Sequence, residues 1–321
     1  MDLKGDPYIR GILSGLVSIF NKIFKANFRM QTFPVPFRVL AEGMELVIFE
    51  EFPTGQLARH LSRDLEKRNA TLNDPEYRKR FKRQYKDKLT PKVWQKDFGD
   101  AYVLESPDKS MIGKSFVDLA RERNQHPVDT FLDLVVEMDK DILWETTIGN
   151  HDPTRYKPLY NDMSGIIGFA DSGAHINNMA FYNFPLRFLR YVQASHENGD
   201  PIMSYEKAVW RLTKENADFF NLDAGHLAEG KRADITIIDP ENLSDKVHEY
   251  HKAPFLNGVN RLVNRNDEVV SLVMINGKIA WENGAFKPEF GKQRFGQFLK
   301  GKHDYKLDTR SETSDARLVK N

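Results

Sequence analysis

Cysteine is absent from the 321-residue sequence. Its absence excludes disulfides, metal sites with cysteine ligands and a cysteine nucleophile within this chain. A surplus of charge of one sign is also missing, because 47 Lys and Arg residues stand against 46 Asp and Glu residues. That balance argues against a dedicated nucleic-acid-binding protein. We therefore expect no nucleic-acid partner and, from the lack of cysteine, a cytoplasmic location.

Long apolar runs are missing as well. No run reaches the roughly 18–20 apolar residues that span a bilayer, and the nearest candidate covers only residues 11–20. Acidic residues precede this run and no small-x-small cleavage site follows it, so we predict an amphipathic helix instead of a signal peptide. Its apolar face would consist of Ile12, Leu16, Ile19, Phe20 and Ile23. We expect no membrane partner.

The remaining composition, 40% apolar and 29% charged, is that of an ordinary globular protein with a sizeable core. Residues 78–88 hold seven basic side chains and one acid. We predict a solvated helix face there. A phosphate-binding patch, in which Phe81 and Tyr85 would stack on bases, is the alternative, but no nucleic-acid-binding motif surrounds it.

The middle of the chain alternates helices and strands. Residues 115–138 predict two helices, the first with a capping box of Ser115 and Asp118 and the second beginning at His126-Pro127. Residues 150–162 contain two prolines and are predicted to form a loop. Two further helices are expected at 185–193 and 204–220.

The apolar run 163–170 predicts a strand buried on both faces, and Asp171 stands at its end. In parallel α/β folds, catalytic groups gather at this end of the strands. Ser172 and Gly173 permit a sharp turn, and His175 follows within reach. From this pattern alone, a catalytic role for Asp171 and a simple turn-capping role are equally supported.

After residue 222 the pattern becomes β. We predict a strand at 233–238 and a hairpin of 269–275 with 278–281, joined through Asn276-Gly277. These patterns divide the sequence into three predicted regions. Residues 1–222 form the α/β part, 223–287 a small β-module and 288–321 a polar C-terminal tail.

Four sequence segments follow one another in a fixed order. They are GFADSGAH at 168–175, FPLRFLRYV at 184–192, MSYEKAVWRLTKENADFFNL at 203–222 and GHLAEGKRADITIIDP at 225–240. Together they resemble the C-terminal half of an amidohydrolase. Within that superfamily the sequence is most similar to the N-acyl-D-amino-acid deacylase branch, amidohydrolase family 3.

The resemblance implies an α/β fold, the C-terminal part of a (β/α)8 TIM-type barrel followed by a small β-sandwich. It implies a metal-dependent hydrolase of a non-peptide amide bond, with zinc as the expected divalent metal and a small-molecule amide as substrate. Asp171 matches the family's catalytic aspartate, which contacts the metal and moves a proton between water and the leaving amine. Substrate contacts are expected from His175, Ser172, Gly173 and His151.

One feature of the family is missing. Its members carry an H-x-H pair on the first barrel strand, whereas this sequence has none and its first histidine is His60. The main metal ligands are thus expected in a missing N-terminal part. That half, or a second copy of the chain, is the expected partner and would cover the open barrel edges. The alternative is a non-catalytic, truncated remnant that acts as an interaction module. His248 and His251 are predicted to be surface loop residues, because their spacing does not fit a zincin helix.

Overall fold

The structure is a computed structural model that describes residues 8–87, 90, 93–168, 170–171, 173–256, 260–264 and 266–301. The helices are α1 (Ile9–Phe24), α2 (Pro53–His60), α3 (Leu65–Asn73), α4 (Pro75–Lys86), α5 (Phe116–Glu122), α6 (Pro127–Met138), α7 (Pro153–Asn161), α8 (Phe184–Glu197), α9 (Tyr205–Leu212) and α10 (Lys214–Phe219). The strands are β1 (Met30–Thr32), β2 (Phe37–Glu42), β3 (Ala101–Glu105), β4 (Leu143–Gly149), β5 (Gly165–Ile167), β6 (Ile235–Ile238), β7 (His251–Pro254), β8 (Asn260–Val263), β9 (Val270–Ile275), β10 (Lys278–Glu282) and β11 (Ala285–Phe286). Short 3-10 helices are η1 (Val47–Glu51), η2 (Phe98–Asp100), η3 (Lys109–Met111), η4 (Asp139–Asp141) and η5 (Asp245–His248).

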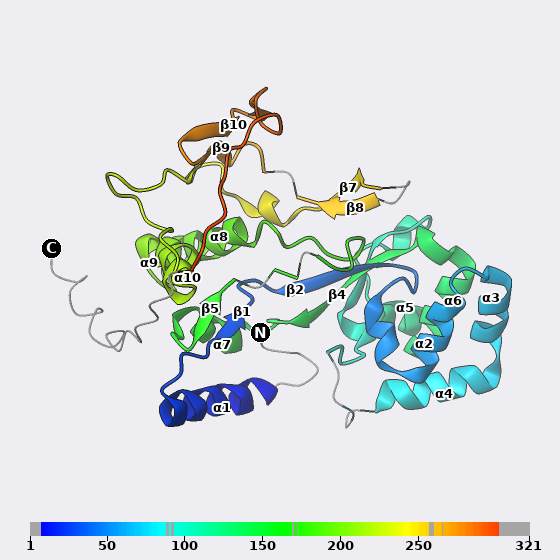
Figure 1. Cartoon of the computed structure of the whole chain (residues 1–321). Coiled ribbons are helices and arrows are strands. Elements are labelled where there is room, and N and C mark those ends of the chain that lie inside the picture. The colour runs from blue at the N-terminus through cyan, green and yellow to red at the C-terminus, as the bar shows by residue number, and fades with distance from the viewer. Residues whose placement is uncertain are drawn as a thin grey trace.

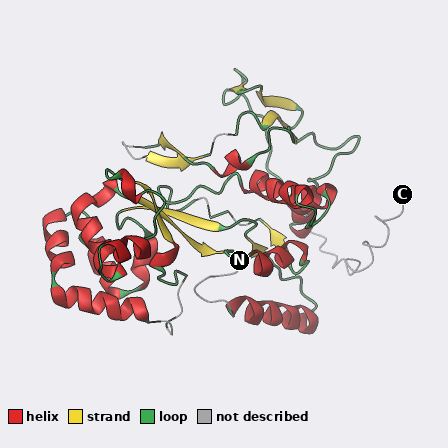
Figure 2. Cartoon of the chain, turned by 180° about the vertical axis from the view of Figure 1, so that it is seen from behind, coloured by secondary structure: helices red, strands yellow, loops and turns green. Residues whose placement is uncertain are grey.

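A three-stranded antiparallel sheet, in the order β2-β4-β3, lies at the centre of the chain. Alternate side chains of a strand point to opposite faces, so this sheet presents two different surfaces. One face contributes Val39, Ala41, Val103 and Trp144 to the large core. Helices α2–α6 gather on that side of the molecule (Figure 1), and Figure 2 shows the same helical cluster from behind.

Aromatic rings dominate this core. Phe131 of α6 stacks on Phe98 with ring centroids 4.7 Å apart, and Phe116 of α5 meets Phe131 edge-on at 5.0 Å. Trp144 donates its indole N–H to the Gly43 carbonyl over 2.7 Å, so its polar atom is satisfied in the interior. These contacts hold the helical cluster against the sheet.

The two helices predicted at 115–138 are confirmed as α5 and α6. The predicted capping box is present, since Ser115 Oγ accepts from the Asp118 amide at 3.1 Å and Asp118 accepts from the Ser115 amide at 3.2 Å. The His126 ring accepts from the Val128 amide at 3.1 Å and caps α6.

The basic run lies on α4, as predicted for a helix face. Phe81 is fully buried and therefore offers no ring for stacking on a base. Arg78 contacts Asp133 at 2.6 Å and Lys82 contacts Asp129 at 2.5 Å, so part of the positive charge is neutralised by α6.

The loop predicted for 150–162 is wrong, because α7 covers Pro153–Asn161. Pro153 occupies the first position of the helix. A backbone N–H at this position makes no intrahelical hydrogen bond, so proline, which lacks the N–H, is tolerated there. Asp152 caps the helix by accepting from the Thr154 amide at 2.9 Å. Pro158 lies inside the helix, where burial of Tyr156 and Tyr160 stabilises a segment that proline disfavours.

Strand β5 is fully buried, as its apolar sequence predicted, and pairs in parallel with β1. Asn216 of α10 donates to the Ile167 carbonyl at 2.9 Å and fixes the end of this strand. The mixed α/β content is therefore confirmed. The barrel itself stays a prediction, because β1–β5 is the parallel strand pair in the described part of the chain and the central sheet is antiparallel.

The C-terminal region forms a four-stranded antiparallel sheet in the order β11-β10-β9-β6. The predicted hairpin is confirmed, with Asn276 and Gly277 at φ of 50° and 82°. Strands β7 and β8 form a separate two-stranded ribbon. The β-sandwich stays a prediction. Of the predicted tail, 288–301 contains no helix or strand and 302–321 lies outside the described residues.

Helix α1 confirms the predicted amphipathic helix, but it buries none of its residues. It lies at the edge of the molecule beside α7 (Figure 1). The exposed fractions of Ile12, Ile23 and Phe24 are 62%, 66% and 64%. No helix in the described ranges has the length and apolar character that crossing a membrane requires.

Candidate functional site

Asp171 lies in a tight turn just beyond β5. Its φ is 47° and that of His175 is 51°, in the left-handed region that non-glycine residues seldom adopt. The His175 carbonyl accepts from the Asn178 amide at 2.7 Å. The Asn178 side chain in turn donates to the carbonyls of Leu40 (2.8 Å) and Glu45 (2.7 Å). The turn is thereby attached to strand β2.

Asp171 and His175 line the same cavity, which has a volume of about 380 Å³. Its walls are mostly apolar and come from β2, η1, β4 and the segment after the turn. The apolar lining residues are Phe37, Val39, Leu46, Val47, Ile48, Val93, Ile148 and Met179. The structure thus brings together two of the residues that the sequence singled out, and their roles stay predictions.

Two further carboxylates, Glu50 and Glu51 of η1, line this cavity and were missed by the sequence analysis. The acidic pair that closes the apolar run 46–49 was the available signal. Both groups already have partners. Glu50 accepts from Arg59 Nε at 2.8 Å, and Glu51 accepts from the backbone amide of Trp94 at 3.1 Å.

The described residues around this cavity do not assemble a metal site by themselves. The described residues contain no cluster of three or more His, Asp or Glu side chains placed to hold a metal ion. A catalytic zinc ion normally takes about three protein ligands. Asp171 and His175 by themselves do not fit such an ion, so we derive no chemical step through a metal.

The other predicted site residues are His151, Ser172 and Gly173, and neither His151 nor Gly173 is among the residues that line the Asp171 cavity. His151 is exposed and precedes α7, and it is not among the residues that line the Asp171 cavity. Gly173 is exposed, with open space where a Cβ would stand. Ser172 lies outside the described residues.

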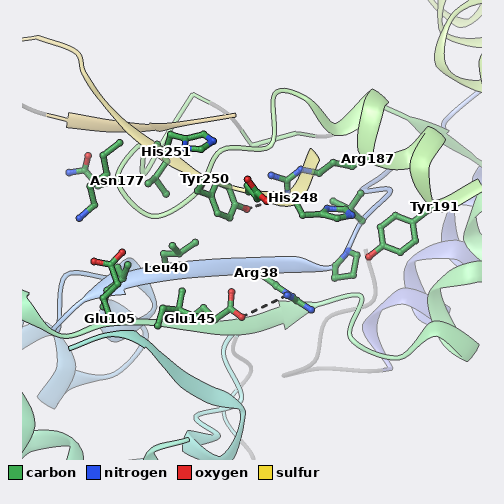
Figure 3. A pocket seen from close by; sticks show the side chains of 17 residues that line it. Arg38, Leu40, Glu105, Glu145, Asn177, Arg187, Tyr191, His248, Tyr250 and His251 are labelled. Carbon is green, nitrogen blue, oxygen red and sulfur yellow. Dashed lines mark hydrogen bonds and ion pairs between the residues drawn. The ribbon is translucent and has the colours of Figure 1, made fainter. Parts of the chain in front are cut away.

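A larger cavity, of about 670 Å³, lies on the opposite face of the central sheet. Arg38 and Leu40 of β2 point into it, whereas Phe37 and Val39 face the Asp171 cavity. Figure 3 shows Arg38, Arg187 and His248 toward one end and Glu105, Asn177 and His251 toward the other. No local sequence pattern indicates this cavity, because its walls come from segments far apart along the chain.

Arg187 of α8 is the buried cation of the larger cavity, with 3% of its surface exposed. It donates to Asn183 Oδ1 (2.8 Å), the Ala180 carbonyl (3.2 Å) and the Tyr250 hydroxyl (3.3 Å). Its guanidinium lies 5.1 Å from the Phe181 ring centroid and 5.0 Å from that of Tyr250. Within the described ranges, no carboxylate lies at ion-pair distance from it.

His248 is partly buried beside this cation, so its assignment to the surface was wrong. Burial, and after it the positive charge of Arg187, lowers the pKa of His248 to about 4, although Asp245 acts in the opposite direction. His251 is exposed, as predicted. Arg38 lies 3.8 Å from Glu145, which offsets part of its charge. At neutral pH this end of the cavity therefore carries a neutral imidazole beside the two arginines, while Glu105, Glu145 and Glu249 also line the cavity.

Comparison with known proteins identifies relatives that match nearly all of this chain, while this chain matches only part of each relative. An uncharacterised protein of Mycobacterium bovis and one of Mycobacterium tuberculosis H37Rv are each 41% identical over 303 residues, or 93% of this chain and 49% of the relative. The chain therefore spans about half the length of these curated relatives. A dihydroorotase of Clostridium acetobutylicum is 35% identical over 86 residues, 25% of this chain and 19% of that protein.

Solved structures give weaker similarity. A D-aminoacylase with a binuclear metal centre has 21% identity and a TM-score of 0.36, over 62% of this chain and 37% of that one. The N-acyl-D-glutamate deacylase of Bordetella bronchiseptica, complexed with zinc and a phosphonate inhibitor, has 21% identity and a TM-score of 0.36, over 63% and 38%. The model of the amidohydrolase family matches residues 115–280, half of the chain, and this region includes β5, Asp171 and His175. The chain belongs to the amidohydrolase family.

Proposed function

We propose that this chain carries the catalytic aspartate of a metal-dependent hydrolase that cleaves a non-peptide C–N bond, with N-acyl amino acids as the substrate class. The observation that carries the proposal is the position of Asp171. It follows a buried parallel strand, in a left-handed turn, and lines a cavity together with His175. Membership of the amidohydrolase family supports this assignment.

The chemistry proposed for Asp171 is proton transfer. Its carboxylate would accept a proton from the attacking water and return it to the amine that leaves, which is ordinary general base and general acid catalysis. The mostly apolar walls of the cavity would limit water around the scissile amide. His175 would contact the substrate, with Ser172, Gly173 and His151 as further proposed contacts.

The metal, for which we propose zinc, needs ligands beyond this chain's described residues. The polypeptide that would supply them corresponds to the half of the mycobacterial relatives that this chain does not match. Two features support docking of that polypeptide here. Helix α1 exposes its whole apolar face, and β1 and β5 form a sheet of only two strands. Apolar faces and free strand edges of this kind favour association with another chain.

The experiment combines this chain with the remaining half of a mycobacterial relative in the presence of zinc. Release of amino acid is measured from N-acetyl-D- and N-acetyl-L-amino acids. We expect turnover by the combination and none by this chain alone. Asp171→Asn should lower kcat by roughly 10²–10⁴, while His175→Ala should mainly raise KM. Asp200→Asn, an exposed carboxylate paired with Lys157, is the matched control and should change neither.

A normal kcat in the Asp171→Asn combination would end the catalytic assignment. The alternative function is a non-catalytic interaction module, and the lack of a three-ligand group among the described residues favours it. This alternative predicts stable association of the two polypeptides with no hydrolysis of any N-acyl amino acid. Association of this chain only with itself would instead assign α1 to a homo-oligomer contact.

A further inference from the structure

The larger cavity combines a buried positive charge with an apolar wall. Arg187 and Arg38 stand toward one end (Figure 3). Leu40, Leu143 and Leu262 line the same space and belong to a small hydrophobic cluster on this face of the sheet. The volume of about 670 Å³ lies within the range of small-molecule sites. The cavity therefore suits a ligand with one polar end and one apolar end.

The sign of the ligand's charge follows from Arg187. Moving a charge out of water is expensive unless an opposite charge lies close to it. The hydrogen-bond acceptors of this guanidinium, Asn183, Ala180 and Tyr250, are all uncharged. Ring contacts reduce the penalty without neutralising the charge. An anion is the ligand that would neutralise it.

Three basic side chains and three carboxylates line the cavity as a whole, so the preference for an anion depends on the position of Arg187. Glu145, the acid nearest to Arg38, is 3.8 Å away and leaves the guanidinium of Arg187 unmatched. His248 lies near these cations and its lowered pKa keeps it neutral at neutral pH, so the imidazole does not affect the choice between a cation and an anion. Arginine is also the side chain whose planar donors best match the two oxygens of a carboxylate.

We propose that the larger cavity is a binding site for an organic carboxylate with an apolar body. The carboxylate would lie against Arg187 and Arg38, and the body would lie along Leu40, Leu143 and Leu262. This site is separated from the Asp171 cavity by the central sheet. The proposal does not rest on the proposed hydrolase activity, since it requires no metal and no second polypeptide.

The first experiment is calorimetric titration of the purified chain with octanoate. Octanamide has nearly the same shape without the charge, and acetate has the charge without the body. We expect octanoate to bind at least about tenfold more tightly than either. Equal binding of octanoate and octanamide would show that no cation recognises the ligand and would overturn the proposal.

Variants then locate the site. Arg38→Gln should weaken octanoate binding about tenfold, and its side chain is 58% exposed, so the fold should tolerate the change. Arg123→Gln is the matched control, because it removes an equal charge from the end of α5, where Arg123 pairs with Glu137. Leu104→Trp should fill the apolar part and abolish binding. Arg187→Gln should also abolish octanoate binding. A circular dichroism spectrum that matches that of the parent chain would show that this variant is folded.

A spectroscopic measurement separates binding at this cavity from binding elsewhere. A carboxylate beside His248 favours the charged imidazole and should raise its pKa from about 4. Titration of the His248 ring by NMR, with and without saturating octanoate, measures this change. Binding of octanoate that leaves the His248 titration unchanged, or that is equal in Arg38→Gln and Arg123→Gln, would refute the proposed site.

Discussion

Replacing Glu215 with glutamine should destabilise the fold far more than its position on a short helix suggests. Glu215 of α10 accepts from Arg211 Nη1 at 2.7 Å and from Arg29 Nη1 at 3.1 Å. The side chains of Arg211 and Glu215 are 0% and 2% exposed. The variant would leave Arg211 charged, buried and without its carboxylate.

The magnitude follows from that burial. Breaking a buried ion pair by removing one partner usually costs about 3–5 kcal/mol. Glutamine retains one acceptor oxygen, so we expect a loss of about 3 kcal/mol in the free energy of unfolding. Among the described residues, Arg211 Nε and Glu215 Oε2 have no hydrogen-bond partner, so the native pair is incompletely satisfied. Replacing both residues, as Arg211→Met with Glu215→Leu, should therefore recover most of the loss.

Urea unfolding followed by circular dichroism measures these differences. Asp218→Asn is the matched control, because Asp218 pairs with Lys214 on the same helix but is about half exposed. Its loss should change the unfolding free energy by no more than about 0.5 kcal/mol. If Glu215→Gln and Asp218→Asn proved equally mild, the reasoning from burial would be wrong.

Three further predictions concern other parts of the chain. The pKa of His248 is about 6.5 in the unfolded chain and about 4 in the fold, so between these pH values the unfolded chain binds one proton more than the folded chain. The free energy of unfolding should therefore fall by about 2 kcal/mol as the pH is lowered from about 6.5 to about 4. In His248→Gln the free energy of unfolding, measured by denaturation across this range, should depend less on pH. Ser115→Ala removes the side-chain cap of α5 and should cost about 1 kcal/mol, measured by urea unfolding, with an unchanged value contradicting the capping role. Gly55→Ala would place a Cβ 2.0 Å from the Phe49 carbonyl oxygen, so its melting temperature should drop by several degrees, whereas a rise would show that α2 can shift away from η1.

Local structure was predictable where a short pattern determines it. The Ser115–Asp118 box and Asn276-Gly277 each require a particular backbone conformation from a few neighbouring residues, and both predictions are confirmed. The apolar run before Asp171 likewise predicted a buried strand, confirmed as β5. Prediction failed at α7, because Pro153 fits a helix start as well as a loop. The helix is also stabilised by the burial of its own Tyr156 and Tyr160 against other elements, which no local pattern shows.

Features assembled from distant segments were not predictable. Strand β2 pairs with β4, which follows it by about a hundred residues, and no local signal specifies that partner or its antiparallel direction. The larger cavity depends on the same pairing, since Arg38 and Glu145 meet only because their strands are adjacent. His248 was assigned to the surface on spacing alone, whereas tertiary packing buries it beside Arg187.

The pairing of β1 with β5 has a consequence for how the chain folds. Met30 pairs with Gly165, so helices α2–α6 lie entirely within the loop that this pair closes. Closing a long loop costs conformational entropy before the contact returns any stabilisation, and such contacts form slowly. Helices α2–α6 contact one another and η1 over shorter separations in the chain. We expect this region to become compact first and so to shorten the loop that remains to be closed. We therefore expect the turn that holds Asp171 to reach its final position late in folding, after the aromatic core has formed.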